Sequence, residues 1–162
     1  MLIVKEGDLF RDVKGPAVIA HGCNAKGKMG AGFASKLKTY FPQSYLRYLT
    51  AHREEGLSVG EYMLSVERWR GVDYHIAHLI VQADYGRDPN VVYVNYDAVE
   101  SCLGIAAEYA AEAGLPIHFP FIGGGLANGN RDTLMKIFES VFAKQDGTLW
   151  LPKAPTGLTF TF

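Results

Sequence analysis

Residues 21–33, with the sequence His-Gly-Cys-Asn-Ala-Lys-Gly-Lys-Met-Gly-Ala-Gly-Phe, are the part of the chain best suited to bind an anion. An apolar run precedes them, and apolar residues at three- and four-residue spacing follow, which predicts a strand, a glycine-rich loop and a helix. Glycines let the backbone approach a ligand closely, and the first turn of a helix leaves N–H groups unpaired. This combination most often binds phosphate. A plain strand-to-helix connection with flexible glycines is the alternative.

A second glycine-rich loop lies nearer the end of the chain, at residues 120–130. It follows a predicted strand over residues 115–119 and precedes a helical pattern, for which Asn130, with Thr133 three residues on, is the predicted N-cap. In an open α/β sheet, ligands bind at the carboxyl ends of the strands. Two such loops at one edge, each followed by a helix N-terminus, predict a site for a diphosphate or a nucleotide derivative.

His21 and Cys23 carry the side chains of the first loop that could take part in catalysis. His21 is predicted to end the strand, where an imidazole could act as a general acid or base, bind phosphate, or hold the loop by hydrogen bonds. Cys23 could be a thiolate, although we favour its interpretation as a small buried residue.

Met29 stands where a P-loop needs Ser or Thr, and the dinucleotide fingerprint lacks its third glycine, which argues against an ATPase, a kinase or a dehydrogenase.

The other histidines do not predict a metal site. His75 and His78 are three residues apart in a predicted strand, so they point to opposite faces and cannot share an ion. The sequence has no HExxH or CxxC motif, and His52 and His118 are interpreted as structural. We therefore expect neither a bound metal nor a cofactor.

The remaining pattern supplies the elements that must position these loops. Apolar runs predict strands over residues 2–4, 17–21, 60–69, 74–82, 115–119 and 148–151. Helical patterns lie between them, and Gly114 followed by Pro116 marks the end of a long amphipathic helix. Alternating strands and helices predict an α/β layered fold with a largely parallel sheet, which a hairpin over residues 60–82 makes mixed. The apolar end of the tail, residues 158–162, could pair as an edge strand.

Length and composition limit the classes of protein that fit. The 162 residues suffice for one domain, and a net charge of −1 means that a nucleic acid would have to be held by a local patch, for which there is no strong signal. The apolar runs are far shorter than the roughly 20 residues needed to cross a bilayer, and no signal peptide is recognised. With two widely spaced cysteines and no disulfide framework, we expect a cytoplasmic monomer without a membrane partner.

Four motifs together resemble those of macrodomains: Gly7-Asp8-Leu9-Phe10 and the segments at residues 19–24, 29–34 and 120–127. The nearest branch is that of the ADP-ribose 1''-phosphate phosphatases and the terminal ADP-ribose protein glycohydrolases, and similar proteins occur in bacteriophages. The resemblance spans residues 1–151 and leaves residues 152–162 as a C-terminal tail. It implies a three-layer α/β/α domain with a mixed, largely parallel sheet and a cleft for ADP-ribose or ADP-ribose 1''-phosphate.

The resemblance also implies roles for individual residues. Asp8 matches an aspartate that accepts from the adenine amino group, although its residue type also suits a simple turn. Asn24 matches an asparagine near the distal ribose, and Trp150 falls where an aromatic ring can lie against adenine or pack under the tail. The glycines of both loops would line the ribose and the phosphates. The implied substrate-binding set is Asp8, Leu9, Asn24, Met29, Gly30, Ala31, Gly32, Ile122, Gly123, Gly124, Gly125, Leu126, Ala127 and Trp150.

Function within the family depends on a few positions. Glycohydrolases of this branch use a lysine and an aspartate where this chain has Gln82 and Ala127, so a covalent sugar intermediate is not expected. Phosphatase-like members carry a histidine that matches His21, for which Asp84 and Asp88 are weak candidate partners. The resemblance implies metal-free hydrolysis of ADP-ribose 1''-phosphate to ADP-ribose and phosphate, with His21 assisting proton transfer and loop N–H groups stabilising charge. Two alternatives stay open: a module that binds ADP-ribose without turnover, and a hydrolase that removes ADP-ribose from modified macromolecules.

Overall fold

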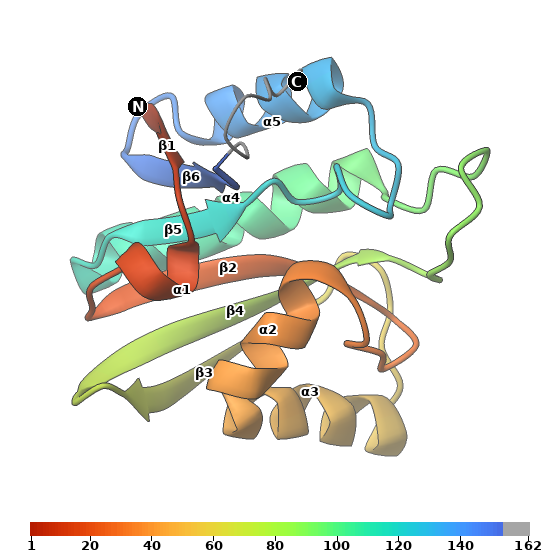
Figure 1. The fold of residues 1–162 in the computed structure, drawn as a ribbon, viewed down its shortest axis with the longest axis horizontal. Helices are drawn as coiled ribbons and strands as arrows, with labels where there is room; N and C mark the ends of the chain where they lie inside the picture. The colour runs from red at the N-terminus through yellow and green to blue at the C-terminus, as the bar shows by residue number, and fades with distance from the viewer. Residues whose placement is uncertain (154–162) are drawn as a thin grey trace.

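A six-stranded sheet organises the molecule (Figure 1). The computed structural model describes residues 1–153, so the expected edge strand at residues 158–162 lies outside the described part. The strands are β1 Leu2–Glu6, β2 Ala17–Asn24, β3 Tyr62–Trp69, β4 Val72–Gln82, β5 Ile117–Pro120 and β6 Gly147–Leu151. They lie in the order β1-β6-β5-β2-β4-β3, and every neighbouring pair is parallel except β3 and β4. The predicted mixed, largely parallel sheet is confirmed.

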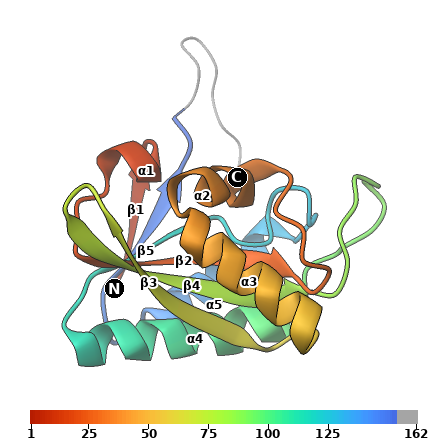
Figure 2. The ribbon, with the colours of Figure 1, turned by 90° about the horizontal axis from the view of Figure 1, so that it is seen from below.

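Helices cover both faces of this sheet and give the expected three layers. They are α1 Leu9–Asp12, α2 Gly32–Tyr40, α3 Pro42–Glu54, α4 Tyr96–Ala113 and α5 Arg131–Val141. Figure 2 shows α1, α2 and α3 on one side of the sheet and α4 and α5 on the other. Within residues 1–153, no helix combines the length and the apolar character needed to cross a bilayer.

The central strand β2 joins the two helical layers. Residues 17–20 are completely buried, because a central parallel strand is covered on both faces, and this is why the sequence shows a continuous apolar run there rather than an alternating pattern. Val18 and Ala20 pack in the cluster that includes α4 and α5, whereas Ala17 and Ile19 pack in the cluster that includes α1 and α2. Odd-numbered residues of β2 therefore face the layer of α1, α2 and α3.

β2 continues three residues beyond the end predicted for it. The sequence predicts that the strand ends at His21, but β2 runs to Asn24. The reason is pairing with its neighbour, because β4 runs beside it as far as Gln82 and residues 21–23 are in register with residues 78–80. The histidine and the cysteine of the glycine-rich motif are therefore fixed by the sheet rather than carried by a loop.

Two helix ends carry the capping residues that the sequence predicts, Asn130 and Gly114. The side-chain oxygen of Asn130 accepts from the backbone N–H of Thr133 at 2.9 Å and caps α5. Gly114 ends α4 in the left-handed conformation, with a φ of 68° that glycine adopts without strain. At the start of α2 the N-cap is Ala31, which makes no side-chain capping bond. The first N–H groups of α2 are therefore available to another acceptor.

Candidate functional site

A cleft of about 810 Å³ lies at the carboxyl ends of β2, β4 and β5. Both glycine-rich loops line it, and so does the connection between β4 and α4, the light-green loop at the right of Figure 1. A cavity of this size is within the range that holds small-molecule ligands. The residues of the predicted site that lie on its wall are His21, Asn24, Gly30, Ala31, Gly32, Ile122, Gly123, Gly125, Leu126 and Ala127.

The wall also includes residues that the sequence did not single out. Lys28 and Arg87 bring two cations to the cleft, and Phe33 and Tyr85 bring aromatic rings. Arg87 and Tyr85 belong to the loop at residues 83–95, whose glycine and proline predict only a connection. The sequence could have indicated that this loop lines the site, because it follows the carboxyl end of a central strand, where ligands bind in open α/β sheets. Loops of such length are also often functional.

Among the described residues, five of the predicted set stand outside this wall: Asp8, Leu9, Met29, Gly124 and Trp150. Asp8 caps α1, where its carboxylate accepts at 3.0 Å from the backbone N–H two residues on. Leu9 and Met29 are each 3% exposed and pack in the core. Trp150 donates from Nε1 to Nδ1 of His118 at 2.9 Å. Their contacts with a ligand stay predictions.

Asp8 is connected to the cleft by stacked aromatic rings. Phe33 lines the cleft, and its ring stacks on that of Phe10, with 4.8 Å between the ring centroids. Phe10 lies in α1, two residues after Asp8. Because β1, β6, β5 and β2 are all parallel, β1 ends at the same edge of the sheet as β2. An extended ligand in the cleft can therefore run along this edge toward Asp8.

Asn24 holds the first glycine-rich loop in its conformation. Its side-chain oxygen accepts from the backbone N–H groups of Lys26 at 3.0 Å and Lys28 at 3.2 Å, and its side-chain nitrogen donates to the Lys28 carbonyl at 2.8 Å. From α3, the Tyr48 hydroxyl donates to the Asn24 carbonyl at 2.6 Å. Asn24 is only 8% exposed. Through these contacts Asn24 fixes the conformation of the loop that forms this part of the cleft wall.

Positive charge and unpaired N–H groups meet on one side of the cleft. Residues 31–34, the N-cap and first turn of α2, line it, and this turn contains no acidic residue. The partial positive charge at a helix N-terminus favours an anion. Lys28 and Arg87 add full charges, and neither belongs to an ion pair within residues 1–153. The described wall does not include the first turn of α5, which Asn130 caps.

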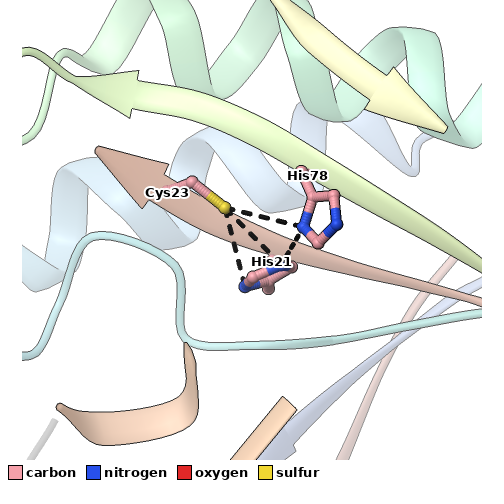
Figure 3. A group of neighbouring side chains, drawn as sticks. All are labelled: His21, Cys23 and His78. Carbon is pink, nitrogen blue, oxygen red and sulfur yellow. Dashed lines mark hydrogen bonds between the residues drawn. The ribbon is translucent and has the colours of Figure 1, made fainter. Parts of the chain in front are cut away.

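His21, Cys23 and His78 form a buried group at the floor of the cleft, where His21 and Cys23 belong to the wall and His78 lies behind them (Figure 3). His21 Nε2 lies 2.6 Å from His78 Nδ1, and Cys23 Sγ lies 3.5 Å from His21 Nε2 and 3.8 Å from His78 Nδ1. His78 Nε2 lies 3.0 Å from the carbonyl of Ser44, which can only accept, so this nitrogen carries the proton and Nδ1 is an acceptor. His21 Nε2 therefore donates to His78, and its Nδ1 keeps a lone pair.

Burial keeps these three side chains neutral. Burial, together with the adjacent His78 ring, lowers the pKa of His21 well below its ordinary value, and burial lowers the pKa of His78 to about 4. Burial also raises the pKa of the Cys23 thiol. The partner of His21 is His78 rather than an aspartate, because the carboxylates of Asp84 and Asp88 accept from N–H groups of their own loop. At neutral pH the group offers imidazole lone pairs and a thiol.

A phage protein resembles this chain over most of its length. An uncharacterized 17.5 kDa protein in the tk-vs intergenic region of Enterobacteria phage T4 is 29% identical over 149 residues, which cover 88% of this chain and 92% of the phage protein. No protein-family model matches the chain. The expected likeness to phage proteins is therefore confirmed.

Solved structures supply the fold family. A macrodomain protein from Streptomyces coelicolor aligns over 93% of this chain and 98% of its own, with a TM-score of 0.73 and 26% identity. The structure of Thermosipho africanus DarTG in complex with ADP-ribose aligns over 98% of this chain and 43% of its own, with a TM-score of 0.74 and 18% identity. Because these likenesses extend over nearly all of the sheet and both helical layers, we conclude that this chain has the macrodomain fold.

Proposed function

We propose that the cleft binds ADP-ribose, with the diphosphate held between the two glycine-rich loops. The observation that carries this proposal is that residues 30–32 of the first loop and residues 122, 123 and 125–127 of the second, which are far apart in the sequence, line one cleft together with the first turn of α2. A Cβ atom added at Gly30, Gly32 or Gly125 would have no neighbouring atom within 4 Å, so the backbone borders open space there. The likeness to a DarTG structure that contains ADP-ribose supports the same ligand.

The charges along the cleft suit such a ligand. The first turn of α2 supplies unpaired N–H groups, and Lys28 and Arg87 supply two cations for the two negative phosphates. The adenine lies along the sheet edge toward Asp8, past the stacked rings of Phe33 and Phe10. Asp8 uses Oδ1 to cap α1, and Oδ2 accepts from the adenine amino group.

The substrate that fits both the loops and the buried histidine is ADP-ribose 1''-phosphate. Water attacks the phosphorus of its terminal phosphate, the bond from phosphorus to the C1'' oxygen breaks, and ADP-ribose and phosphate leave. His21 takes the proton of the water on Nδ1, which keeps a lone pair because Nε2 donates to His78, and then returns this proton to the departing C1'' oxygen. Backbone N–H groups of the loops stabilise the charge that develops on the phosphate oxygens.

One observation favours a second candidate, a module that binds ADP-ribose without turnover. Burial lowers the pKa of His21, which makes its imidazole a weak base. Removal of ADP-ribose from macromolecules through a covalent sugar intermediate has less support. Gln82 lies on the wall of the cleft at the position where the resemblance calls for a lysine amine, and it donates to the carbonyl of Asp84 instead.

Three assays separate these candidates. Calorimetric titration with ADP-ribose, ATP and NAD tests the ligand, and we expect ADP-ribose to bind most tightly. Release of inorganic phosphate from ADP-ribose 1''-phosphate, lost in His21→Ala, supports the phosphatase. Binding without release supports the module, and turnover that survives His21→Ala removes this histidine from the mechanism. Release of ADP-ribose from a modified protein would favour the third candidate.

A further inference from the structure

The buried group at the floor of the cleft brings together potential metal ligands that the proposed function does not use. His21, Cys23 and His78 each offer one ligand atom, and these atoms all lie within 4.8 Å of one another. We propose that the three side chains bind one divalent transition-metal ion, with Zn²⁺ as the best match. Two imidazoles and a thiolate are donors that zinc prefers, and three protein ligands are typical of a zinc site that keeps a fourth position open.

The sheet itself assembles these ligands. His21 and Cys23 are two residues apart on β2, so their side chains emerge from the same face of the sheet. His78 is the register partner of His21 on the neighbouring strand β4, and Figure 3 shows its ring beside the other two side chains. Central strands hold ligands more rigidly than loops do, which favours a preformed site.

The distances are close to those of a coordinated ion. Zn–N bonds of about 2.0–2.1 Å and a Zn–S bond of about 2.3 Å in a tetrahedron separate two nitrogens by roughly 3.4 Å and a nitrogen from a sulfur by roughly 3.6 Å. Cys23 Sγ lies 3.5 Å from His21 Nε2 and 3.8 Å from His78 Nδ1, which agrees with these values. The two nitrogens are 2.6 Å apart, so the rings must separate by roughly 0.8 Å to admit the ion.

The surroundings of His78 match those of a metal-bound histidine. Metal-binding imidazoles usually donate their second N–H to a carbonyl or a carboxylate, which fixes the ring and the tautomer. His78 Nε2 donates to the Ser44 carbonyl at 3.0 Å and so presents the Nδ1 lone pair to Cys23 and His21. Ser44 is fixed in turn, because its backbone N–H donates to Glu67 Oε1 at 2.8 Å.

Binding of the ion changes the protonation of Cys23 and His21, and every proton is accounted for. The thiol of Cys23 loses its proton to solvent and becomes the thiolate ligand, while His21 keeps one proton by moving it from Nε2 to Nδ1. The site then carries one net positive charge. His21 and Cys23 line the cleft and His78 does not, so the open fourth position faces the cleft, where a water or a ligand oxygen completes the tetrahedron.

One consequence rests on the proposed phosphatase function. With the ion bound, His21 has no lone pair left to accept a proton from water. A water in the open fourth position would lose its proton more readily under the charge of the ion and supply the hydroxide that attacks phosphorus. Metal binding itself does not depend on which ligand occupies the cleft, so it can be measured separately.

Cobalt titration of the chelator-treated full chain tests the proposal. We expect one Co²⁺ per chain, a thiolate-to-cobalt absorption band, and loss of this band when one equivalent of Zn²⁺ is added. Cys23→Ser should abolish the band, and His78→Gln should weaken Zn²⁺ binding at least tenfold. Matched controls are Cys102→Ser, the other buried cysteine, and His75→Gln, from the opposite face of β4, both of which should bind as the wild type does.

Several results would overturn the metal site. A wild-type chain without a charge-transfer band, or a band of equal strength in Cys23→Ser, would show that the three side chains are only a hydrogen-bonded core group. Circular dichroism establishes that each variant is folded, and a rise in the melting temperature with Zn²⁺ in wild type but not in folded Cys23→Ala gives a second readout. ADP-ribose titration of the same metal-free samples reports separately on the cleft, so failure of one proposal leaves the other standing.

Discussion

Lowering the pH from 7 to 5 should destabilise this fold, because His21 and His78 remain neutral while folded and take up protons once the chain unfolds. Burial lowers the pKa of His78 from 6.5 to about 4. As the pH falls through 6.5 the unfolded chain binds a proton that the folded chain excludes, and the loss of stability is complete near pH 4. Between pH 7 and pH 5, His78 alone lowers the free energy of unfolding by about 2 kcal/mol. The pKa of His21 is lowered in the same direction, so its contribution has the same sign.

Urea unfolding at pH 7, 6 and 5 measures this loss directly. We expect the wild-type free energy of unfolding to fall across the series. His78→Gln should start lower at pH 7, because it disturbs the contacts with His21 and Ser44, but it should lose less on acidification. A wild-type free energy of unfolding that is constant from pH 7 to pH 5, or an equal decline in His78→Gln, would refute this reasoning.

Three further substitutions test other parts of the structure. Gly104→Ala in α4, where a Cβ has no neighbour within 4 Å, should raise the free energy of unfolding by about 0.5–1 kcal/mol in urea, and a decrease would count against the description of that helix. Tyr48→Phe removes the hydroxyl that donates to the Asn24 carbonyl, so it should lower the free energy of unfolding by about 1 kcal/mol and weaken ADP-ribose binding in calorimetry. Unchanged values of both would mean that this hydrogen bond does not hold the loop. Arg87→Ala should weaken binding about fivefold, or by about 1 kcal/mol, at low salt and less at high salt, and wild-type affinity at low salt would remove Arg87 from the site.

Local patterns in the sequence were enough to predict most of the elements. The continuous apolar run before His21 marks a strand that is covered on both faces, and Gly114 and Asn130 mark helix ends because each performs its capping role through neighbouring backbone groups. Both glycine-rich loops were expected at the carboxyl edge of a parallel sheet, and both line the cleft there. These features depend on residues close together in the chain, which is why the sequence reveals them.

Contacts between distant segments could not be predicted in this way. Strand periodicity places His75 and His78 on opposite faces, and they do contact different layers, Tyr109 in α4 and Ser44 in α3. Periodicity does not say which strand lies beside β4, so the pairing of His78 with His21 stayed hidden, and with it the buried group that includes Cys23. The extension of β2 to residue 24 was not predicted for the same reason, because it depends on pairing with β4.

Calorimetric titration of ADP-ribose into wild type, Gly30→Ala and Gly104→Ala tests the central claim most directly. A Cβ at Gly30 meets no protein atom within 4 Å and lies on the wall of the cleft, so alanine there leaves the fold intact but occupies space that the ligand needs. We predict tight binding by wild type and Gly104→Ala and at least a tenfold weaker affinity for Gly30→Ala. Equal affinity in all three, or no heat of binding to the wild type, would contradict a ligand held between the two glycine-rich loops.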